Sequence, residues 1–292
     1  MSYILIAKPK ITLLFIFYLL VIPISNYGID FHKKKALLIG VSLKGDKATA
    51  SCIDDVIRFK DLLLSKGFKE SDIIAITSES VCKKNIILDT ITFIAKQLLE
   101  NDLFVFFYSG HGGNVKDIDG DELDRCKNSL KISDTCVNIT CDNNSTYSDQ
   151  TYELYNDYIL DDDLFERMKS FKKARILHIT NSCHSGTIYK ILKKNNENDM
   201  LHFRKDTQTG VAFTSELIHY GATSDSRSII GSASGGNIFV NTVIKIFNKY
   251  TALTYYNFIR YFKGSRVIAY YAEHGENGCY VSDKFKNTLI LE

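Results

Sequence analysis

Continuous apolar runs of strand length, each separated from the next by a helical pattern, constrain the fold of this chain more than any other feature. Such runs occur at residues 36–42, 73–77, 103–109 and 174–180. Strands buried on both faces appear as unbroken apolar runs, and intervening helices connect strands that run parallel. The sequence therefore predicts an α/β fold with a mostly parallel central sheet and helices on both faces.

Helical patterns fill the intervals between these strands. The spacing of apolar residues predicts helices at residues 52–66, 85–100, 161–171, 237–247 and 253–262. The helix at 161–171 opens with three acidic residues, which suit a helix N-terminus. Two later apolar runs, at residues 227–234 and 267–272, predict further strands.

Two long stretches lack any regular pattern. Residues 112–157 are rich in Asp, Asn, Ser, Thr and Gly, and residues 190–210 are polar and basic. Structureless connections of this length are uncommon inside a compact domain unless they are functional or mobile. We expect both stretches to be mobile loops of a single domain that spans residues 29–292.

The first 28 residues form a separate unit. Lys8 and Lys10 precede the apolar run of residues 11–24, and polar residues return at Ser25. This is the layout of a secretory signal peptide. A membrane span needs about 20 apolar residues, and the run is shorter than that. We expect a cleaved signal and a secreted or secretory-pathway protein. The alternatives are an N-terminal anchor and a buried helix.

Charge and cysteine content bear on the binding partners, the oligomeric state and the disulfides of the protein. The 36 basic and 34 acidic residues leave a formal charge of +2, without a long block of one sign. Nucleic-acid and membrane-surface binding need such a block, so we expect neither partner, apart from the N-terminal anchor, and we expect a monomer. The seven cysteines allow up to three disulfides and one free thiol in an exported protein.

Two glycine-flanked turns follow buried strands: His111 lies in YSGHGG and Cys183 in NSCHSG. Ligands of open α/β sheets bind beyond the carboxyl ends of the strands, so these two side chains can meet although 72 positions separate them. Taken singly, each residue is more simply read as structural. Together they indicate a thiolate activated by an imidazole, with backbone N–H groups of Gly112 and Cys183 as oxyanion donors.

These motifs resemble those of the metacaspase and caspase-like cysteine peptidases. The similarity comprises YSGHG, the acidic segment DIDGDE, the DDxL helix start and SCHSG, and it runs over residues 35–186. The resemblance implies a three-layer caspase-like sandwich. It also implies a hydrolase, a thiol-dependent endopeptidase that cuts protein or peptide substrates with a dyad of His111 and Cys183.

The resemblance further implies a pocket for Arg or Lys before the scissile bond. The family motifs carry over to Cys52, Asp55, Ser109 and Asn181 as substrate-binding residues. The family usually has Asp at the position of Asn181, and a neutral amide cannot neutralise a guanidinium, so we expect relaxed selectivity. The simpler alternative for Asp55 is an acid favoured by the helix macrodipole.

The resemblance requires no cofactor, but calcium activation is common in the family. Asp161 and Asp162 match its paired acids, whereas Lys127, Asn128 and Lys190 stand where the family tends to be acidic. Hard cations choose oxygen ligands, yet DIDGDE lacks the later Glu of an EF-hand. The alternative is a solvated acidic loop and helix start.

Two other functions and one regulatory event stay open. A legumain-like peptidase or transamidase shares the His-Gly and Cys arrangement, and a non-catalytic caspase-like protein would bind partners without turnover. The segment 190–205 carries Lys193, Lys194, Arg204 and Lys205. An exposed basic segment behind the nucleophile is a candidate for self-cleavage, and the alternative is an ordinary solvated connection.

Overall fold

The computed structural model of the 292-residue chain describes nine ranges. They are residues 31–116, 130–132, 137–139, 148–183, 185, 212–223, 236–262, 270–275 and 281–291. The predicted signal peptide, the loop at 190–210 and the strand at 227–234 lie outside them. Within the described ranges, no helix is long and apolar enough to cross a membrane.

A six-stranded sheet forms the middle layer, in the order β11-β10-β9-β3-β1-β2. The strands are β1 (Lys34–Gly40), β2 (Ile73–Ile76), β3 (Leu103–Ser109), β9 (Arg175–Asn181), β10 (Glu216–Gly221) and β11 (Tyr270–His274). Only β11 pairs antiparallel with its neighbour; the other pairs are parallel. The predicted α/β fold with a mostly parallel sheet is confirmed.

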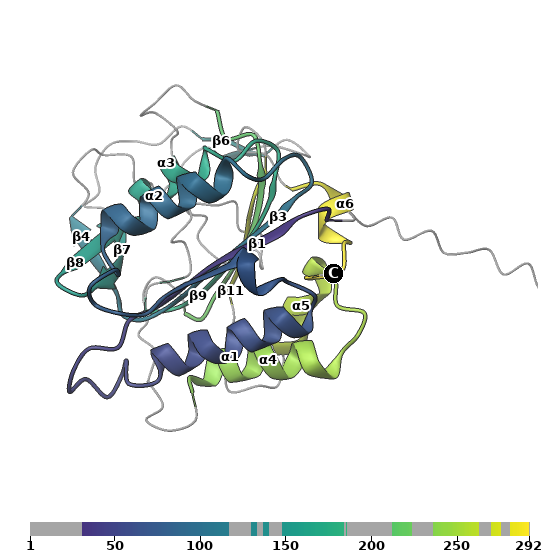
Figure 1. The fold of residues 1–292 in the computed structure, drawn as a ribbon. Coiled ribbons are helices and arrows are strands. Elements are labelled where there is room, and N and C mark those ends of the chain that lie inside the picture. The colour runs from purple at the N-terminus through teal and green to yellow at the C-terminus, as the bar shows by residue number, and fades with distance from the viewer. Residues whose placement is uncertain are drawn as a thin grey trace, which may run out of the picture.

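Helices cover both faces of this sheet (Figure 1). One face carries α1 (Cys52–Ser65) and α4 (Ile238–Lys249), and the other carries α2 (Lys84–Ala95) and α3 (Asp161–Met168). Short helices complete the described part: η1 (Glu70–Asp72), α5 (Tyr255–Phe258), η2 (Ile259–Phe262) and α6 (Asp283–Lys286). The molecule is therefore a three-layer sandwich.

The alternation of side chains along β3 explains why its run is apolar throughout. Leu103, Val105 and Phe107 belong to the core under α1 and α4. Phe104, Phe106 and Tyr108 belong to the core under α2 and α3. Because successive side chains of a strand point to opposite faces, a central strand with a core on each side must be apolar at every position.

The amphipathic pattern of α1 has a clear start and stop. Its buried residues include Val56, Phe59 and Leu63, spaced three and four positions apart, and the ring of Phe59 stacks on Phe107 of β3 at 4.4 Å. The helix ends before Gly67, whose φ of +81° suits glycine, and the Phe68 N–H then donates to the Leu63 carbonyl. The predicted helix is confirmed.

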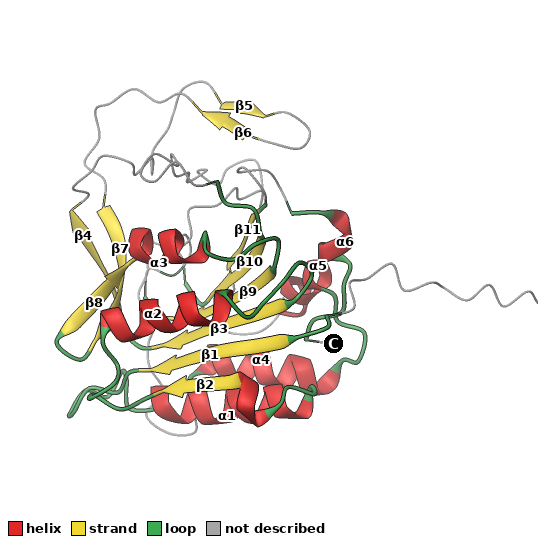
Figure 2. Ribbon diagram, turned by 45° about the horizontal axis from the view of Figure 1, so that its top comes forward, coloured by secondary structure: helices red, strands yellow, loops and turns green. Residues whose placement is uncertain are grey.

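The expectation that residues 112–157 form one loop is wrong for the part that the structure describes. Strands β4 (Gly112–Lys116), β7 (Ser148–Leu154) and β8 (Asp157–Leu160) form an antiparallel sheet, and β5 (Leu130–Ile132) pairs with β6 (Val137–Ile139). Their sequences carry no apolar run that would predict strands. The β5–β6 and β7–β8 pairs join neighbouring segments, whereas β4 pairs with β7 across more than thirty residues. Figure 2 shows β4, β7 and β8 at the end of the molecule toward which β1, β2 and β3 point.

Strand β10 was not predicted, because Glu216 and His219 interrupt its apolar run. Both side chains are buried and paired. The Glu216 carboxylate accepts hydrogen bonds from the backbone and hydroxyl of Ser282 and pairs with Arg175 at 2.9 Å. Polar residues of a buried strand are thus satisfied by partners that are remote in sequence.

Candidate active site

The register of the central sheet brings the two glycine-flanked turns together. Ser109, the last residue of β3, pairs with Asn181, the last residue of β9. The Gly110 N–H then donates to the Asn181 carbonyl at 3.2 Å. His111 and Cys183 each lie two residues beyond this registered pair, so both residues leave the sheet at the same place.

Gly112 packs directly on the backbone beside Cys183. A Cβ atom at Gly112 would collide with the Cys183 carbonyl oxygen and meet the Ser182 hydroxyl at 3.0 Å. Only glycine permits this approach. The two predicted oxyanion donors, Gly112 and Cys183, therefore belong to neighbouring backbone segments.

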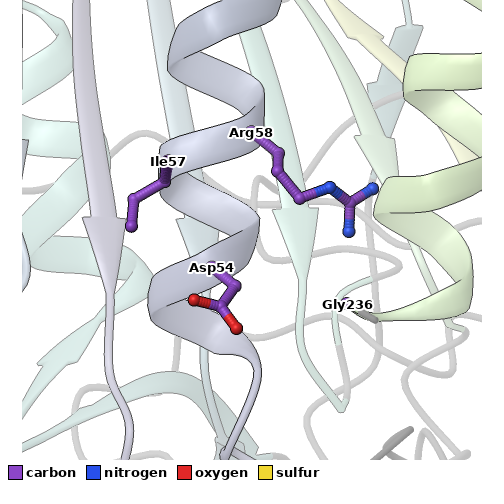
Figure 3. Close-up of a pocket in the computed structure, with 4 residues that line it drawn as sticks. All are labelled: Asp54, Ile57, Arg58 and Gly236. Carbon is purple, nitrogen blue, oxygen red and sulfur yellow. The ribbon is translucent and has the colours of Figure 1, made fainter. Parts of the chain in front are cut away.

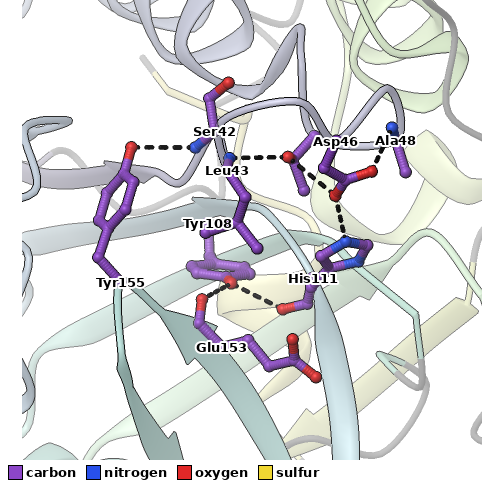
Figure 4. Close-up of polar contacts among 9 residues, drawn as sticks. Ser42, Leu43, Asp46, Ala48, Tyr108, His111, Glu153 and Tyr155 are labelled. Atoms are coloured by element: carbon purple, nitrogen blue, oxygen red, sulfur yellow. Dashed lines mark hydrogen bonds and ion pairs between the residues drawn. The ribbon is translucent and has the colours of Figure 1, made fainter.

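Three groups hold His111 in place, and Figure 4 marks the contacts of two of them, Asp46 and Tyr108. Its Nε2 lies 2.5 Å from Oδ2 of Asp46, in the loop that follows β1. Its carbonyl oxygen accepts hydrogen bonds from the hydroxyl of Tyr108 at 2.7 Å and from the Glu153 N–H at 3.1 Å. About a third of the His111 side chain remains exposed, 32% by area, so the ring is accessible from solvent.

The loop at residues 43–49 fixes the Asp46 carboxylate. The Ala48 N–H donates to Oδ1 at 2.9 Å, and the hydroxyl of Thr49 donates to Oδ2 at 3.1 Å. Thr49 is buried and itself accepts a hydrogen bond from the Leu43 N–H. These donors, led by the Ala48 N–H, lower the pKa of Asp46.

Sequence analysis did not find Asp46. The available signal was an Asp three positions before a Thr, ahead of a helix, in a pattern that forms local turns in many proteins. Only the folded chain shows that His111, 65 residues further on, meets this carboxylate.

A buried network holds the backbone around Cys183. The hydroxyl of Thr223 donates to the Ser182 carbonyl at 3.2 Å, and the Thr223 N–H donates to the Ser185 hydroxyl at 3.1 Å. Nε2 of His219 lies 2.7 Å from the Ser185 carbonyl and therefore donates to it. Thus β10 and the residues after it support the turn that presents the thiol.

The predicted pocket residues also come together. The Ser109 hydroxyl donates to Oδ2 of Asp55 at 2.8 Å, and Nδ2 of Asn181 donates to Ser109 at 2.8 Å. Burial raises the pKa of Asp55, although the Asn237 N–H, which donates to Oδ1 at 2.9 Å, opposes this effect. Asp55 therefore does more than stabilise the start of α1. Its buried carboxylate connects the ends of β3 and β9 with the backbone of Asn237.

No disulfide involves the three cysteines of the described ranges, Cys52, Cys82 and Cys183. Burial raises the pKa of Cys52 to about 12 and of Cys82 to about 11, so both are poor nucleophiles. Cys52 also interacts with Ser109 beside the pocket. Cys183 is the partly exposed one. The expectation of up to three disulfides and one free thiol is wrong, because three of the seven cysteines form no disulfide.

A pocket of about 280 Å³ lies between α1 and the start of α4, lined by Asp54, Ile57, Arg58 and Gly236. Figure 3 shows Ile57 and Arg58 pointing to opposite sides of α1. The guanidinium of Arg58 reaches α4, where it bonds to Asn241. The lining side chains do not converge, so this pocket is not the candidate active site.

The predicted calcium ligands Asp161 and Asp162 open α3, and the Asp162 N–H donates to Oδ1 of Asp161 at 3.1 Å. Calcium takes about 6–8 oxygen ligands. Within the described ranges, no group of three or more His, Cys, Asp or Glu residues is arranged to hold a metal ion. These residues alone do not make a calcium site, and the acidic segment at 117–124 lies outside the described ranges. Calcium activation stays a prediction.

Comparison with known proteins identifies the family. The model of the metacaspase, peptidase C14 domain, matches residues 34–192. Metacaspase-1 of Schizosaccharomyces pombe is 30% identical over 237 residues, which cover 72% of this chain and 49% of that protein. Metacaspase-1 of Yarrowia lipolytica is 35% identical over 162 residues, or 53% of this chain and 32% of the relative.

The chain thus spans about half or less of the length of these relatives. A crystal structure of a Geobacter sulfurreducens protein shares the fold, with a TM-score of 0.60 at 18% identity, over 89% of this chain and 98% of that one. With the family model matching more than half of the residues, this chain belongs to the metacaspase family of C14 peptidases.

Proposed function

We propose that the protein is a cysteine endopeptidase in which Cys183 is the nucleophile and His111 is the base. The observation that carries this proposal is the registered pair of Ser109 and Asn181, which places both turns at one end of the sheet. His111 takes the thiol proton, and the thiolate attacks the scissile carbonyl carbon. The proton then passes to the leaving amine, and water hydrolyses the thioester.

Backbone N–H groups of Gly112 and Cys183 are the proposed donors to the oxyanion of the tetrahedral intermediate. Support comes from the contact of Gly112 with the Cys183 carbonyl, which keeps the two segments adjacent. Donors fixed by the backbone need no reorganisation when the charge develops.

For specificity, we propose that the pocket at Asp55 takes Arg or Lys before the scissile bond, with weaker selectivity than two carboxylates would give. The Asp55 side chain is fully buried, and its carboxylate is bound by Ser109 and the Asn237 N–H. Asn181 adds a neutral amide beside it. One buried carboxylate attracts a cation, but less strongly than a pair does.

The test is a peptide-library digest with the purified full chain, with and without calcium. We expect Cys183→Ala to abolish cleavage and His111→Ala to reduce it by several orders of magnitude. Cys82→Ala and His32→Ala are the matched controls, because one removes a buried thiol and the other an exposed imidazole away from the site. Circular dichroism verifies that all variants fold. Full activity in Cys183→Ala would refute the mechanism.

The same digest separates the alternatives. A transamidase would join peptides as well as cut them, and a non-catalytic protein would show no cleavage. Labelling by a peptidyl electrophile adds a second criterion, since only an activated thiol at Cys183 reacts rapidly. A folded chain that is neither labelled nor cleaves peptides would favour the non-catalytic alternative.

A further inference from the structure

The Asp46 carboxylate is a third charged group beside the proposed dyad, and nothing in the dyad mechanism requires it. It reaches His111 from the loop after β1, whereas Cys183 approaches from the end of β9. Asp46 and Cys183 thus belong to different segments of the chain. The Asp46 side chain is 29% exposed and the ring 32%, so the pair is partly shielded from water rather than freely solvated.

Neighbouring groups of its own loop hold Asp46 in position for this contact. Its Oδ1 accepts the Ala48 N–H, and its Oδ2 accepts both the Thr49 hydroxyl and the ring of His111. A carboxylate that accepts several hydrogen bonds stays ionised, in keeping with its lowered pKa. An ionised carboxylate has no proton to give and can only accept.

The proton on His111 is assigned by this contact. Because Asp46 only accepts, the ring nitrogen that faces it, Nε2, carries the hydrogen in the neutral imidazole. The other nitrogen, Nδ1, then has the lone pair that can take a proton.

We propose that Asp46 is a positioning residue that fixes the Nε2–H form of His111 and leaves Nδ1 as the base for Cys183, an inference that rests on the proposed peptidase function. When Nδ1 takes the thiol proton, the ring becomes positively charged, and the adjacent carboxylate stabilises that charge.

The other titratable groups near His111 do not share this role. The hydroxyl of Tyr108 binds the His111 carbonyl rather than the ring, and burial raises its pKa far above the usual range, so it stays neutral. The Glu153 carboxylate lies against Gly113, where a Cβ atom would meet its Oε1 at 2.8 Å. Cys183 is the reaction partner. Figure 4 shows the Glu153 carboxylate away from the contact between Asp46 and the ring.

The test measures the alkylation of Cys183 by iodoacetamide against pH, read by peptide mass mapping, together with kcat and KM for a peptide substrate. In Asp46→Ala we expect kcat at pH 7 to fall about 10- to 100-fold with KM within about twofold. The pH of half-maximal alkylation should rise by about one unit, because the ring loses its stabilising charge.

Asp46→Asn gives a sharper result. The Ala48 N–H keeps the amide oxygen at the Oδ1 position, so the amide nitrogen replaces Oδ2 and donates to Nε2. This places the ring hydrogen on Nδ1, which then cannot act as base. We expect Asp46→Asn to be at least as slow as Asp46→Ala, although the Asn side chain is nearly the same size as Asp and keeps the hydrogen bond from the Ala48 N–H. A merely structural role predicts that it resembles the parent.

Asp61→Ala is the matched control, since Asp61 is exposed on α1. It should leave both readouts unchanged. Parent-like alkylation profiles and parent-like kcat in both Asp46 variants would overturn the proposal, even if turnover depends on Cys183 and His111. Conversely, a shifted alkylation profile in a chain that cleaves no peptide would keep the role of Asp46 and refute the peptidase function. Measurement of Tm checks that the near-isosteric Asp46→Asn variant is folded.

Discussion

Replacing Asn181 by Asp tests the specificity pocket most directly. In the structure, Nδ2 of Asn181 donates to the Ser109 hydroxyl at 2.8 Å and lies 3.4 Å from Oδ2 of Asp55. The two side chains are almost completely buried. Asn181→Asp puts a carboxylate oxygen where the amide nitrogen stands, so two carboxylates would face each other at about that separation.

The size of the effect follows from this distance. Two unit charges 3.4 Å apart repel by about 5 kcal/mol at an effective dielectric constant of about 20. Burial already raises the pKa of Asp55, and a second carboxylate at residue 181 would raise it further. A bound guanidinium or ammonium removes the repulsion. If about 1.4 kcal/mol of this repulsion energy is converted into tighter binding of a basic side chain, the ratio of kcat/KM for basic over neutral peptides rises about tenfold.

The same repulsion predicts a pH-dependent loss of stability. A carboxyl whose pKa is raised in the folded state stabilises the fold fully below its unfolded pKa of about 3.9, and this stability is lost as the pH rises through the folded pKa. Asp55 has such a raised pKa, and the new neighbour raises it further. The Tm of Asn181→Asp should therefore fall below that of the parent as the pH rises above about 4.

The assay compares kcat/KM for peptides that differ only in Arg or Gln before the scissile bond, and the Tm of each variant from pH 4 to pH 8. Asn181→Ala is the control, because it removes the amide without adding a charge. An unchanged Arg-to-Gln ratio in Asn181→Asp, or a Tm difference that does not vary with pH, would show that Asn181 does not line a pocket with Asp55.

Two further predictions concern acid stability and processing. Burial lowers the pKa of His219 to about 4. Between about pH 4 and pH 6.5 the folded state therefore binds fewer protons than the unfolded state. The free energy of unfolding should fall by about 3 kcal/mol as the pH falls through that window. The urea midpoint of His219→Gln should depend less on pH there, and parallel curves would contradict this assignment. The segment 190–205, outside the described ranges, should be self-cleaved after its basic residues. N-terminal sequencing should then find fragments in the active chain but not in Cys183→Ala, whereas an intact chain that cleaves added peptides would exclude self-cleavage.

Local sequence patterns were sufficient to predict the main strands and helices of the sandwich. The apolar runs of β1, β3 and β9 and the helical spacing of α1 are properties of neighbouring residues, so periodicity reveals them. Parallel strands end at the same edge of a sheet, so the sequence alone predicts that His111 and Cys183 lie close together, and the register of β3 with β9 places their turns side by side.

Tertiary structure decided what surrounds that pair. The pairing of Asp46 with His111, the support of Ser185 by His219, and the ladder of β4 with β7 join segments far apart in the chain. Polar side chains carry no periodic signal, because their position is set by the partner that satisfies them. A buried or half-buried polar group is stable only beside such a partner, and the folded chain alone determines which residue that is.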